Sequence, residues 1–272
     1  DLNPAQRDAA IHRNGPMLVV AGAGSGKTRV LTHRIAHLIG NDNINPFQIL
    51  AITFTNKAAQ EMKDRVAALV GPVAEKMWVS TFHSACVRIL RRDAEQLGYP
   101  STFSIYDQAD AVRLTGYVAR DLGLDTKKFV PRSVHAHISN LKNELVSTHQ
   151  ALEKAEGVFD RKIAEIYEEY QRRLRTSGAM DFDDLLNVTV ELFTAHPDTL
   201  SHYQERFQHV LVDEYQDTNP AQNDIVLKLG DKHQNVFVVG DSDQSVYAFR
   251  GADIRNILEF EKAFPDTSVV VL

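Results

Sequence analysis

The 272-residue sequence contains little that points to an oxidising compartment or to a membrane. Cys86 is the only cysteine, so no disulfide can form within the chain. No apolar run approaches the roughly 18–20 residues that a membrane-spanning helix needs. The first residues, from Asp1 to Pro4, lack the pattern of a signal peptide. These absences lead us to expect a cytoplasmic protein with no membrane partner.

Charge alone identifies no partner. The formal net charge is −6, which does not by itself indicate nucleic-acid binding. Residues 85–180 hold 15 Lys and Arg against 13 Asp and Glu, whereas the rest of the chain is acidic. A mildly basic middle fits a local DNA track, but a solvated helix face would have the same composition. The apolar content of 43% is sufficient for a sizeable core.

A glycine-rich loop lies near the start of the chain. The apolar run Met17–Ala21 predicts a buried strand, and residues 27–39 predict a helix after the loop. This order is typical of a phosphate-binding loop, in which backbone N–H groups and a helix N-terminus surround phosphate oxygens. Ala21 replaces the usual first glycine. Lys27 is predicted to reach the β- and γ-phosphates, and the hydroxyl of Thr28 to hold Mg²⁺. The predicted nucleotide-binding residues are Ala21, Gly22, Ala23, Gly24, Ser25, Gly26, Lys27 and Thr28.

An acidic pair follows another apolar strand, predicted over residues 210–212. Asp213 is predicted to hold Mg²⁺, and Glu214 to orient and deprotonate the attacking water. Considered alone, the pair fits an exposed acidic turn equally well. Together with the upstream loop it predicts a site for ATP and Mg²⁺ with phosphoryl-transfer chemistry.

Two further predicted strands, over 49–53 and 77–80, end in residues with binding chemistry. Phe54, Asn56 and Lys57 follow the first strand, and His83 follows the second. Ligands of open α/β sheets bind at the carboxyl ends of the strands. By pattern alone, however, Phe54 fits a core position, Asn56 a helix cap and His83 a structural hydrogen bond.

The segment after the predicted strand 236–239 combines a polar amide, two aromatic rings and a cation. Gln244 could contact a γ-phosphate, and Tyr247 or Phe249 could stack on a base beside Arg250. Packing in the core is the alternative interpretation of the two rings.

Between residues 103 and 178 the alternation of strands and helices stops. Amphipathic helices are predicted over 107–122, 134–145 and 160–176, which indicates a helical insertion. His135 and His137 are two residues apart on a helix and therefore point to different sides. No residues of this segment have the spacing of metal ligands.

Together these motifs resemble the superfamily 1 DNA helicases of the UvrD/PcrA/Rep type, over essentially the whole chain. The matching segments are 2–6, 21–28, 53–59, 81–84, 181–185, 212–217 and 240–252. The resemblance implies an α/β fold: a RecA-like P-loop parallel sheet flanked by helices, with an inserted all-helical subdomain. The core would comprise residues 1–105 and 179–272, and the insertion 106–178.

The resemblance also implies roles for individual residues. Gln6 would read adenine and Arg29 would reach the nucleotide, whereas Glu214, Lys27 and Gln244 would act in hydrolysis. The residues implied to contact DNA are Phe54, Asn56, Lys57, His83, Tyr247, Phe249 and Arg250. Relatives often have Trp where this chain has Phe249.

The implied function is that of an ATP-dependent 3′→5′ DNA helicase or translocase in DNA repair or replication restart. Its partners would be single-stranded DNA, single-strand–duplex junctions and DNA-repair proteins. The chain stops before the family's second RecA-like domain, so we expect an N-terminal fragment that hydrolyses ATP poorly without its C-terminal half. Two alternatives remain: the ATPase half of a recombination helicase–nuclease, and a non-motor module that binds single-stranded DNA or docks proteins.

Overall fold

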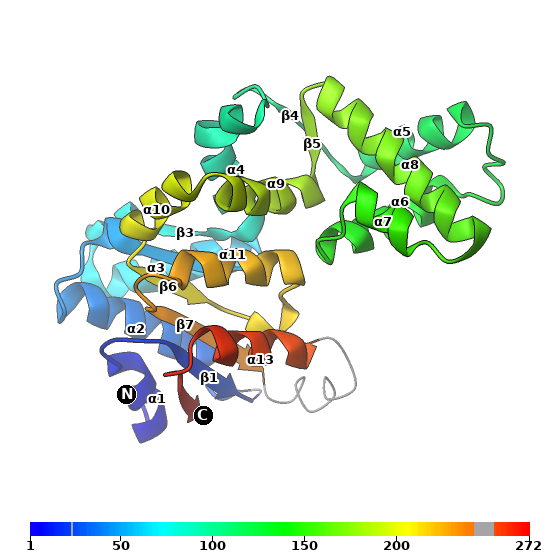
Figure 1. Ribbon diagram of the computed structural model, residues 1–272. Coiled ribbons are helices and arrows are strands. Elements are labelled where there is room, and N and C mark those ends of the chain that lie inside the picture. Colours follow the sequence, from blue (N-terminus) through cyan, green and yellow to red (C-terminus); the bar gives the residue numbers. More distant parts are fainter. Residues whose placement is uncertain (23, 242–252) are drawn as a thin grey trace. The chain divides into compact units, whose positions relative to one another are not determined.

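The computed structural model describes residues 1–22, 24–241 and 253–272 (Figure 1). The chain divides into two compact units. Unit 1 comprises Asp1–Ala85 and His196–Leu272, and unit 2 comprises Cys86–Ala195. The predicted helical insertion, 106–178, therefore lies entirely within unit 2.

Unit 1 is built on a six-stranded sheet in which every pairing is parallel. Its strands are β1 (Met17–Ala21), β2 (Ile49–Thr53), β3 (Trp78–Thr81), β6 (His209–Val212), β7 (Val236–Asp241) and β8 (Ser268–Val271). Their order across the sheet is β3-β2-β6-β7-β1-β8. Because all strands run the same way, their carboxyl ends lie together along one side of the sheet, called the carboxyl edge, where the sequence places its polar motifs.

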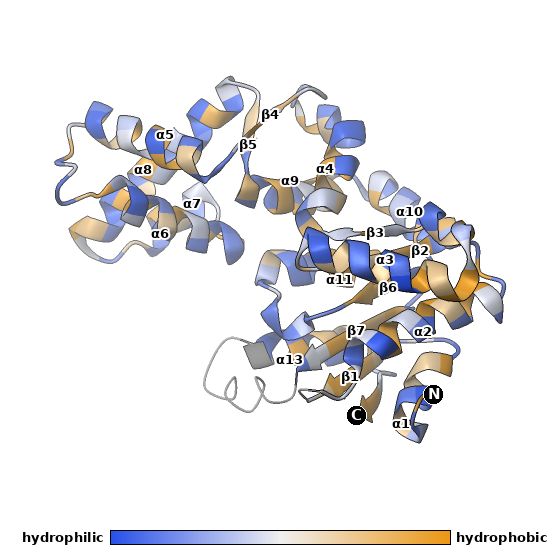
Figure 2. Cartoon of the chain, turned by 180° about the vertical axis from the view of Figure 1, so that it is seen from behind, coloured by the Kyte–Doolittle hydropathy of each residue, from blue (hydrophilic) through white to orange (hydrophobic). Residues whose placement is uncertain are grey.

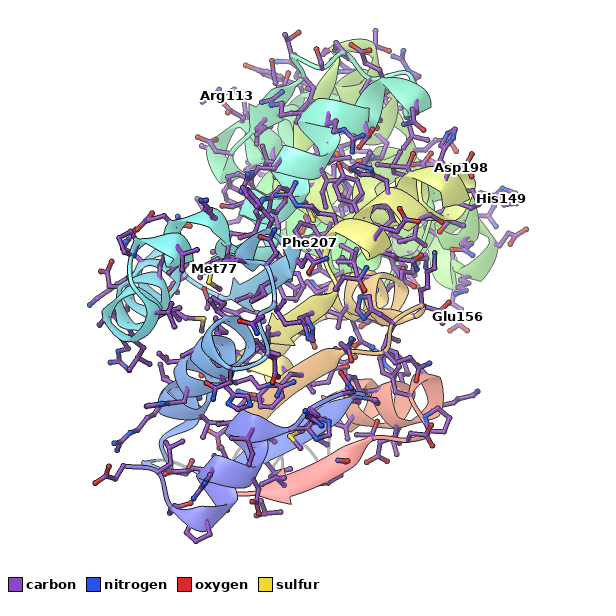
Figure 3. All side chains as sticks on the ribbon, turned by 90° about the vertical axis from the view of Figure 1, so that its left-hand side faces the viewer. Met77, Arg113, His149, Glu156, Asp198 and Phe207 are labelled. Atoms are coloured by element: carbon purple, nitrogen blue, oxygen red, sulfur yellow. The ribbon has the colours of Figure 1, made fainter. Side chains whose placement is uncertain are left out.

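Helices cover both faces of this sheet. Figure 3 shows α2 and α3 on one face and α11 and α13 on the other. The helices of unit 1 are α1 (Pro4–Ile11), α2 (Lys27–Gly40), α3 (Asn56–Val70), α10 (Pro197–Arg206), α11 (Pro220–Gly230) and α13 (Asp253–Ala263). Short 3₁₀ turns, η1 (Pro46–Gln48), η2 (Pro72–Lys76) and η4 (Tyr215–Asp217), connect them to strands. Among the helices that the structure describes, none has both the length and the apolar character to cross a membrane.

Apart from β3, the strands of unit 1 are apolar along most of their length, which Figure 2 shows as orange arrows among helices of mixed colour. On one face Val19, Leu211 and Phe237 are buried against Leu31 of α2 and Met62 of α3. A parallel sheet that is covered on both faces requires such continuous apolar strands. This requirement explains why the strands could be predicted from apolar runs.

The two edge strands differ in their cover. On β3, Trp78 is only 8% exposed, because the centroid of the Phe207 ring lies 4.8 Å from the centroid of its own ring and the Arg206 guanidinium lies 5.3 Å from that centroid. On β8, Val269 and Val271 are 53% and 68% exposed. The described sheet therefore ends on one side in β3, whose Trp78 side chain is covered, and on the other in β8, an open edge with exposed valines.

Unit 2 is mainly helical. Its elements are most of α4 (Phe82–Asp93), η3 (Ala94–Leu97), β4 (Ser104–Tyr106), α5 (Gln108–Asp121), α6 (Pro131–Asn143), α7 (Thr148–Lys154), α8 (Gly157–Thr176), β5 (Ala179–Asp181) and α9 (Phe182–Ala195). The three predicted helices correspond to α5, α6 and α8. The short helix α7 and the parallel pair β4–β5 were not predicted. Apolar side chains of α5, α6 and α8, including Val118, Ile138 and Ile166, form a separate core.

Candidate nucleotide-binding site

The loop after β1 is closed by its own hydrogen bonds. The Ser25 hydroxyl and N–H both donate to the Gly22 carbonyl, at 2.5 Å and 3.1 Å. Gly24 and Gly26 have φ of +73° and +79°, a conformation that side chains with a Cβ rarely adopt. Gly26 then caps α2, whose first residue is Lys27. The sequence prediction of a tight glycine turn leading directly into a helix is confirmed.

Gln6 contacts this loop across 19 positions of sequence. Its Nε2 donates to the Ser25 carbonyl at 2.8 Å, while its Oε1 accepts the Asn3 N–H at 2.9 Å in the capping box of α1. A Cβ added to Gly26 would lie 2.7 Å from the same Nε2. Gln6 is thus packed beside the loop, where its side chain contacts the Ser25 carbonyl. Its contact with adenine stays a prediction.

Lys27 and Glu214 meet at the carboxyl edge of the sheet. The Lys27 ammonium donates to Glu214 Oε1. Burial lowers the pKa of Lys27, but its hydrogen bond to Glu214 and the charges of Glu214, Asp213 and Asp241 outweigh burial and raise it. The Lys27 side chain is therefore a permanently charged cation near three carboxylates. Its positive charge is the one that a triphosphate would bind.

The acidic pair after β6 is held in an unusual backbone conformation. Glu214 has φ +52° and ψ +42°, and its N–H donates to Asp213 Oδ1 at 2.8 Å. A non-glycine residue in this left-handed region costs about 1–3 kcal/mol. Asp213 is 8% exposed, and burial followed by the charge of Glu214 raises its pKa. The Glu214 carboxylate contacts Lys27, whereas the buried Asp213 carboxylate accepts the Glu214 N–H.

Thr28 and Arg29 begin α2 together with Lys27. Thr28 is half-buried and Arg29 is exposed. Magnesium prefers oxygen ligands, so the Thr28 hydroxyl and the Asp213 carboxylate form a donor set that fits this ion. Their joint coordination of Mg²⁺, and the contact of Arg29 with nucleotide, stay predictions.

Two residues that the sequence did not assign also belong to this edge. Gln216 donates to Glu214 Oε2 at 2.7 Å and accepts the Asp241 N–H at 3.0 Å. The charge of the Asp241 carboxylate acts on Lys27. The available signal was their position within the matching segments 212–217 and 240–252.

Residues predicted to contact DNA lie at the ends of β2 and β3. Thr53 and Thr81 are paired in the sheet, so the residues that follow them are neighbours. The rings of Phe54 and Phe82 meet edge-to-face, with centroids 5.8 Å apart. Phe54 is half-buried, so it is neither a core residue nor a freely exposed one.

Asn56 and Lys57 lie in the first turn of α3 and are exposed. The cap of α3 is Thr55, whose hydroxyl accepts the Ala58 N–H at 3.0 Å, so the alternative that made Asn56 the cap is wrong. His83 is half-buried in α4, and burial lowers its pKa. Ala23, Gln244, Tyr247, Phe249 and Arg250 lie outside the described residues.

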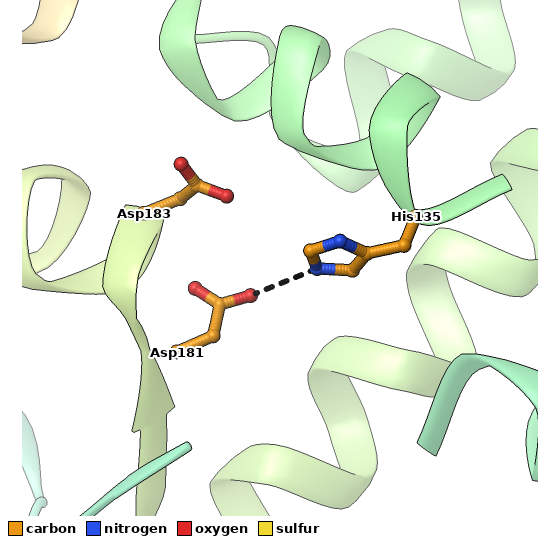
Figure 4. A group of neighbouring side chains, drawn as sticks. All are labelled: His135, Asp181 and Asp183. Carbon is orange, nitrogen blue, oxygen red and sulfur yellow. Dashed lines mark ion pairs between the residues drawn. The ribbon is translucent and has the colours of Figure 1, made fainter. Parts of the chain in front are cut away.

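Unit 2 contains a second cluster of ionisable groups, shown in part in Figure 4. His135, Asp181 and Asp183 offer ligand atoms within 4.8 Å of one another, although their sequence spacing did not suggest a group. However, Asp181 Oδ2, which lies 3.9 Å from His135 Nε2, already accepts hydrogen bonds from Lys142 at 2.8 Å and Tyr170 at 2.7 Å. Because Asp181 Oδ2 already accepts hydrogen bonds from an ammonium and a hydroxyl, the cluster fits a buried ion-pair network better than a metal site.

The glycine loop, the lysine that begins α2 and the acidic pair at the end of a nearby parallel strand define a P-loop domain with a RecA-like fold. The sequence model for the UvrD/REP helicase N-terminal domain matches residues 2–265. The chain therefore belongs to the UvrD/REP helicase N-terminal domain family.

Named relatives agree over the full length of the chain. It is 51% identical to the ATP-dependent DNA helicase PcrA of Bacillus subtilis and 55% identical to the ATP-dependent DNA helicase UvrD1 of Mycobacterium bovis. It is also 51% identical to PcrA of Staphylococcus aureus. Each alignment covers 100% of the chain and 37% of the relative. The chain thus spans little more than a third of the length of these curated relatives.

Proposed function

We propose that this chain is the N-terminal motor part of an ATP-dependent DNA helicase that moves 3′→5′ along single-stranded DNA. The observation that carries the proposal is the contact of Lys27 with Glu214 at the edge of the sheet. A phosphate-binding lysine and a base for water are thereby within reach of one ligand. The family and the names of the relatives support a DNA helicase.

In the proposed reaction, loop N–H groups and Lys27 bind the phosphates of ATP, with Gln6 and Arg29 on the nucleotide. Thr28 and Asp213 would hold Mg²⁺, which neutralises charge on the phosphate oxygens. Because the Lys27 ammonium is occupied by Glu214, the triphosphate must compete for it. Once the ammonium turns to phosphate, the Glu214 carboxylate is available to orient and deprotonate water.

Single-stranded DNA is proposed to follow the ends of β2 and β3. The Phe54 ring offers a surface for base stacking, and Asn56, Lys57 and His83 offer polar contacts to the strand. Tyr247, Phe249 and Arg250 would extend this track, with Gln244 sensing the γ-phosphate. We further propose a cytoplasmic role in repair or replication, with junctions and repair proteins as partners, and a second RecA-like domain that completes the ATP site.

The catalytic part of the proposal is tested by Glu214→Gln in the complete natural protein. Loss of a general base lowers rates by about 10²–10⁴-fold, so DNA-stimulated ATP hydrolysis should fall by this factor while nucleotide affinity is retained. Glu205→Gln is the matched control, because Glu205 is a 70% exposed carboxylate of the same unit. Normal turnover in Glu214→Gln would contradict the assignment.

The DNA track is tested by Lys57→Ala, with Lys63→Ala as its control six residues further along α3. If Lys57 contacts a phosphate, its removal makes the negative slope of log K against log salt shallower by about 1. Fluorescence anisotropy with labelled single strands measures this slope. Equal slopes in the two variants would exclude Lys57 from the track, and unwinding of 5′-tailed but not 3′-tailed duplexes would reverse the proposed direction.

A further inference from the structure

Gln216 lies between the ends of two neighbouring strands. It belongs to η4, directly after the acidic pair, and is 2% exposed. Its Nε2 donates to Glu214 Oε2 at 2.7 Å, with Asp217 Oδ2 further away at 3.5 Å. Its Oε1 accepts the N–H of Asp241, the last residue of β7, at 3.0 Å. One side-chain amide therefore connects the carboxylate after β6 to the backbone of β7.

The two partners fix which way this amide faces. A carboxylate oxygen only accepts and a backbone N–H only donates, so the NH₂ group must face Glu214 and the oxygen must face Asp241. Reversing the amide would oppose two oxygens on one side and two donors on the other. Neither a carboxylate nor an apolar side chain of the same length can make both bonds at neutral pH.

The amide also complements the lysine on the other oxygen of the same carboxylate. Lys27 holds Glu214 Oε1 and Gln216 holds Oε2. When a triphosphate takes over the Lys27 ammonium, as the proposed function requires, the bond from Gln216 remains. That bond then sets the direction of the carboxylate, whose backbone is already in a strained, left-handed conformation.

We propose that Gln216 is a positioning residue for hydrolysis, which holds the Glu214 carboxylate in line for water and ties it to the end of β7. The proposal rests on the assigned role of Glu214 as general base. Gln216 touches neither nucleotide nor water in this role. Its effect is on turnover, and nucleotide affinity does not depend on it.

The test uses the complete natural protein with Gln216→Met, Gln216→Glu and the control Gln204→Met. Gln204 is another buried glutamine of unit 1, whose Nε2 donates to the Lys228 carbonyl at 2.8 Å. Misplacement of a reacting group by about 1 Å costs about 10²-fold. We expect kcat for ATP to fall by about this factor in Gln216→Met, with KM and the dissociation constant of a fluorescent ADP analogue within threefold of the unsubstituted protein. Gln204→Met should change none of these quantities.

Gln216→Glu separates positioning from simple loss of fold. The introduced carboxyl lacks the donor at neutral pH, but regains one when it is protonated. The ratio of its kcat to that of Gln216→Met should therefore rise as the pH falls from 8 to 6. A ratio independent of pH, or a kcat in Gln216→Met within twofold of the unsubstituted protein, would overturn the proposal. An unsubstituted protein that does not hydrolyse ATP would instead overturn the proposed function itself.

Discussion

Replacing Lys142 by Met should strongly destabilise unit 2. The side chain of Lys142 is fully buried, and its Nζ lies 2.8 Å from Asp181 Oδ2 and 3.0 Å from Asp184 Oδ1. Burial lowers the pKa of Lys142, but the two carboxylates outweigh burial and raise it. Burial and the charge of Asp181 raise the pKa of Asp184 to about 6. The three charges are thus held inside unit 2 by one another.

The size of the effect follows from what the substitution leaves behind. Lys142→Met removes the cation and leaves its carboxylate partners buried, which typically costs about 3–5 kcal/mol in free energy of unfolding. An exposed pair is worth about 0–1 kcal/mol, so Lys162→Met is the matched control: its partner Glu165 lies 3.3 Å away, and both side chains are about 40% exposed. With a denaturant slope of about 2 kcal/mol per molar urea, the midpoint for unit 2 should fall by about 2 M.

Urea unfolding followed by circular dichroism and by fluorescence measures this change. Trp78, the only tryptophan, lies in unit 1, so its fluorescence reports on that unit, whereas circular dichroism includes the helices of unit 2. Adding Asp181→Asn and Asp184→Asn to Lys142→Met removes the unpaired charges and should recover most of the loss. A midpoint for Lys142→Met no lower than that for Lys162→Met would refute the reasoning, as would a triple variant as unstable as the single one.

Three other predictions test separate parts of unit 1. Gly26→Ala should weaken nucleotide binding more than Gly24→Ala in a titration, because both have positive φ but only at Gly26 would the new Cβ meet Gln6, at 2.7 Å. His209 has its pKa lowered to about 4, first by burial, so the unfolded chain takes up a proton near pH 6.5 and stability falls as the pH drops from 6.5 toward 4. His209→Gln should remove about 2 kcal/mol of the loss between pH 8 and pH 5, which urea midpoints at both pH values measure. Thr55→Ala removes the cap of α3 and should cost about 1 kcal/mol in thermal unfolding, and an unchanged melting temperature would show that the cap contributes little.

The sheet of unit 1 could largely be predicted because its strands are continuous apolar runs between clear turns. The bounds predicted for β1 and β2 are those observed. Strand β7 extends past the predicted 236–239 to Asp241, since Gly240 and Asp241 pair with Val20 and Ala21. Neither residue type favours a strand, so only the neighbouring strand reveals the extension.

Individual hydrogen bonds and ion pairs between segments distant in sequence were beyond prediction. Gln6 and Gln216 both lie in segments that match the family, but their local pattern does not identify the partners that they find through tertiary placement. Lys142 occurs in an amphipathic helix, where an exposed lysine is the usual expectation. Asp181, by contrast, lies in a segment that was recognised as a family motif. Its bond to the Asp184 N–H at 2.8 Å shows that part of this segment serves to begin α9.

The open edge at β8 has a consequence for handling the 272-residue chain by itself. Backbone N–H and C=O groups on the outer side of this strand have no neighbouring strand in the described sheet, and Val269 and Val271 add an apolar surface to them. The strand Ser268–Val271 also lacks the lysine or proline that commonly discourages pairing between molecules. At high concentration, molecules of this chain should therefore associate edge to edge through β8. Val271→Lys should weaken this association.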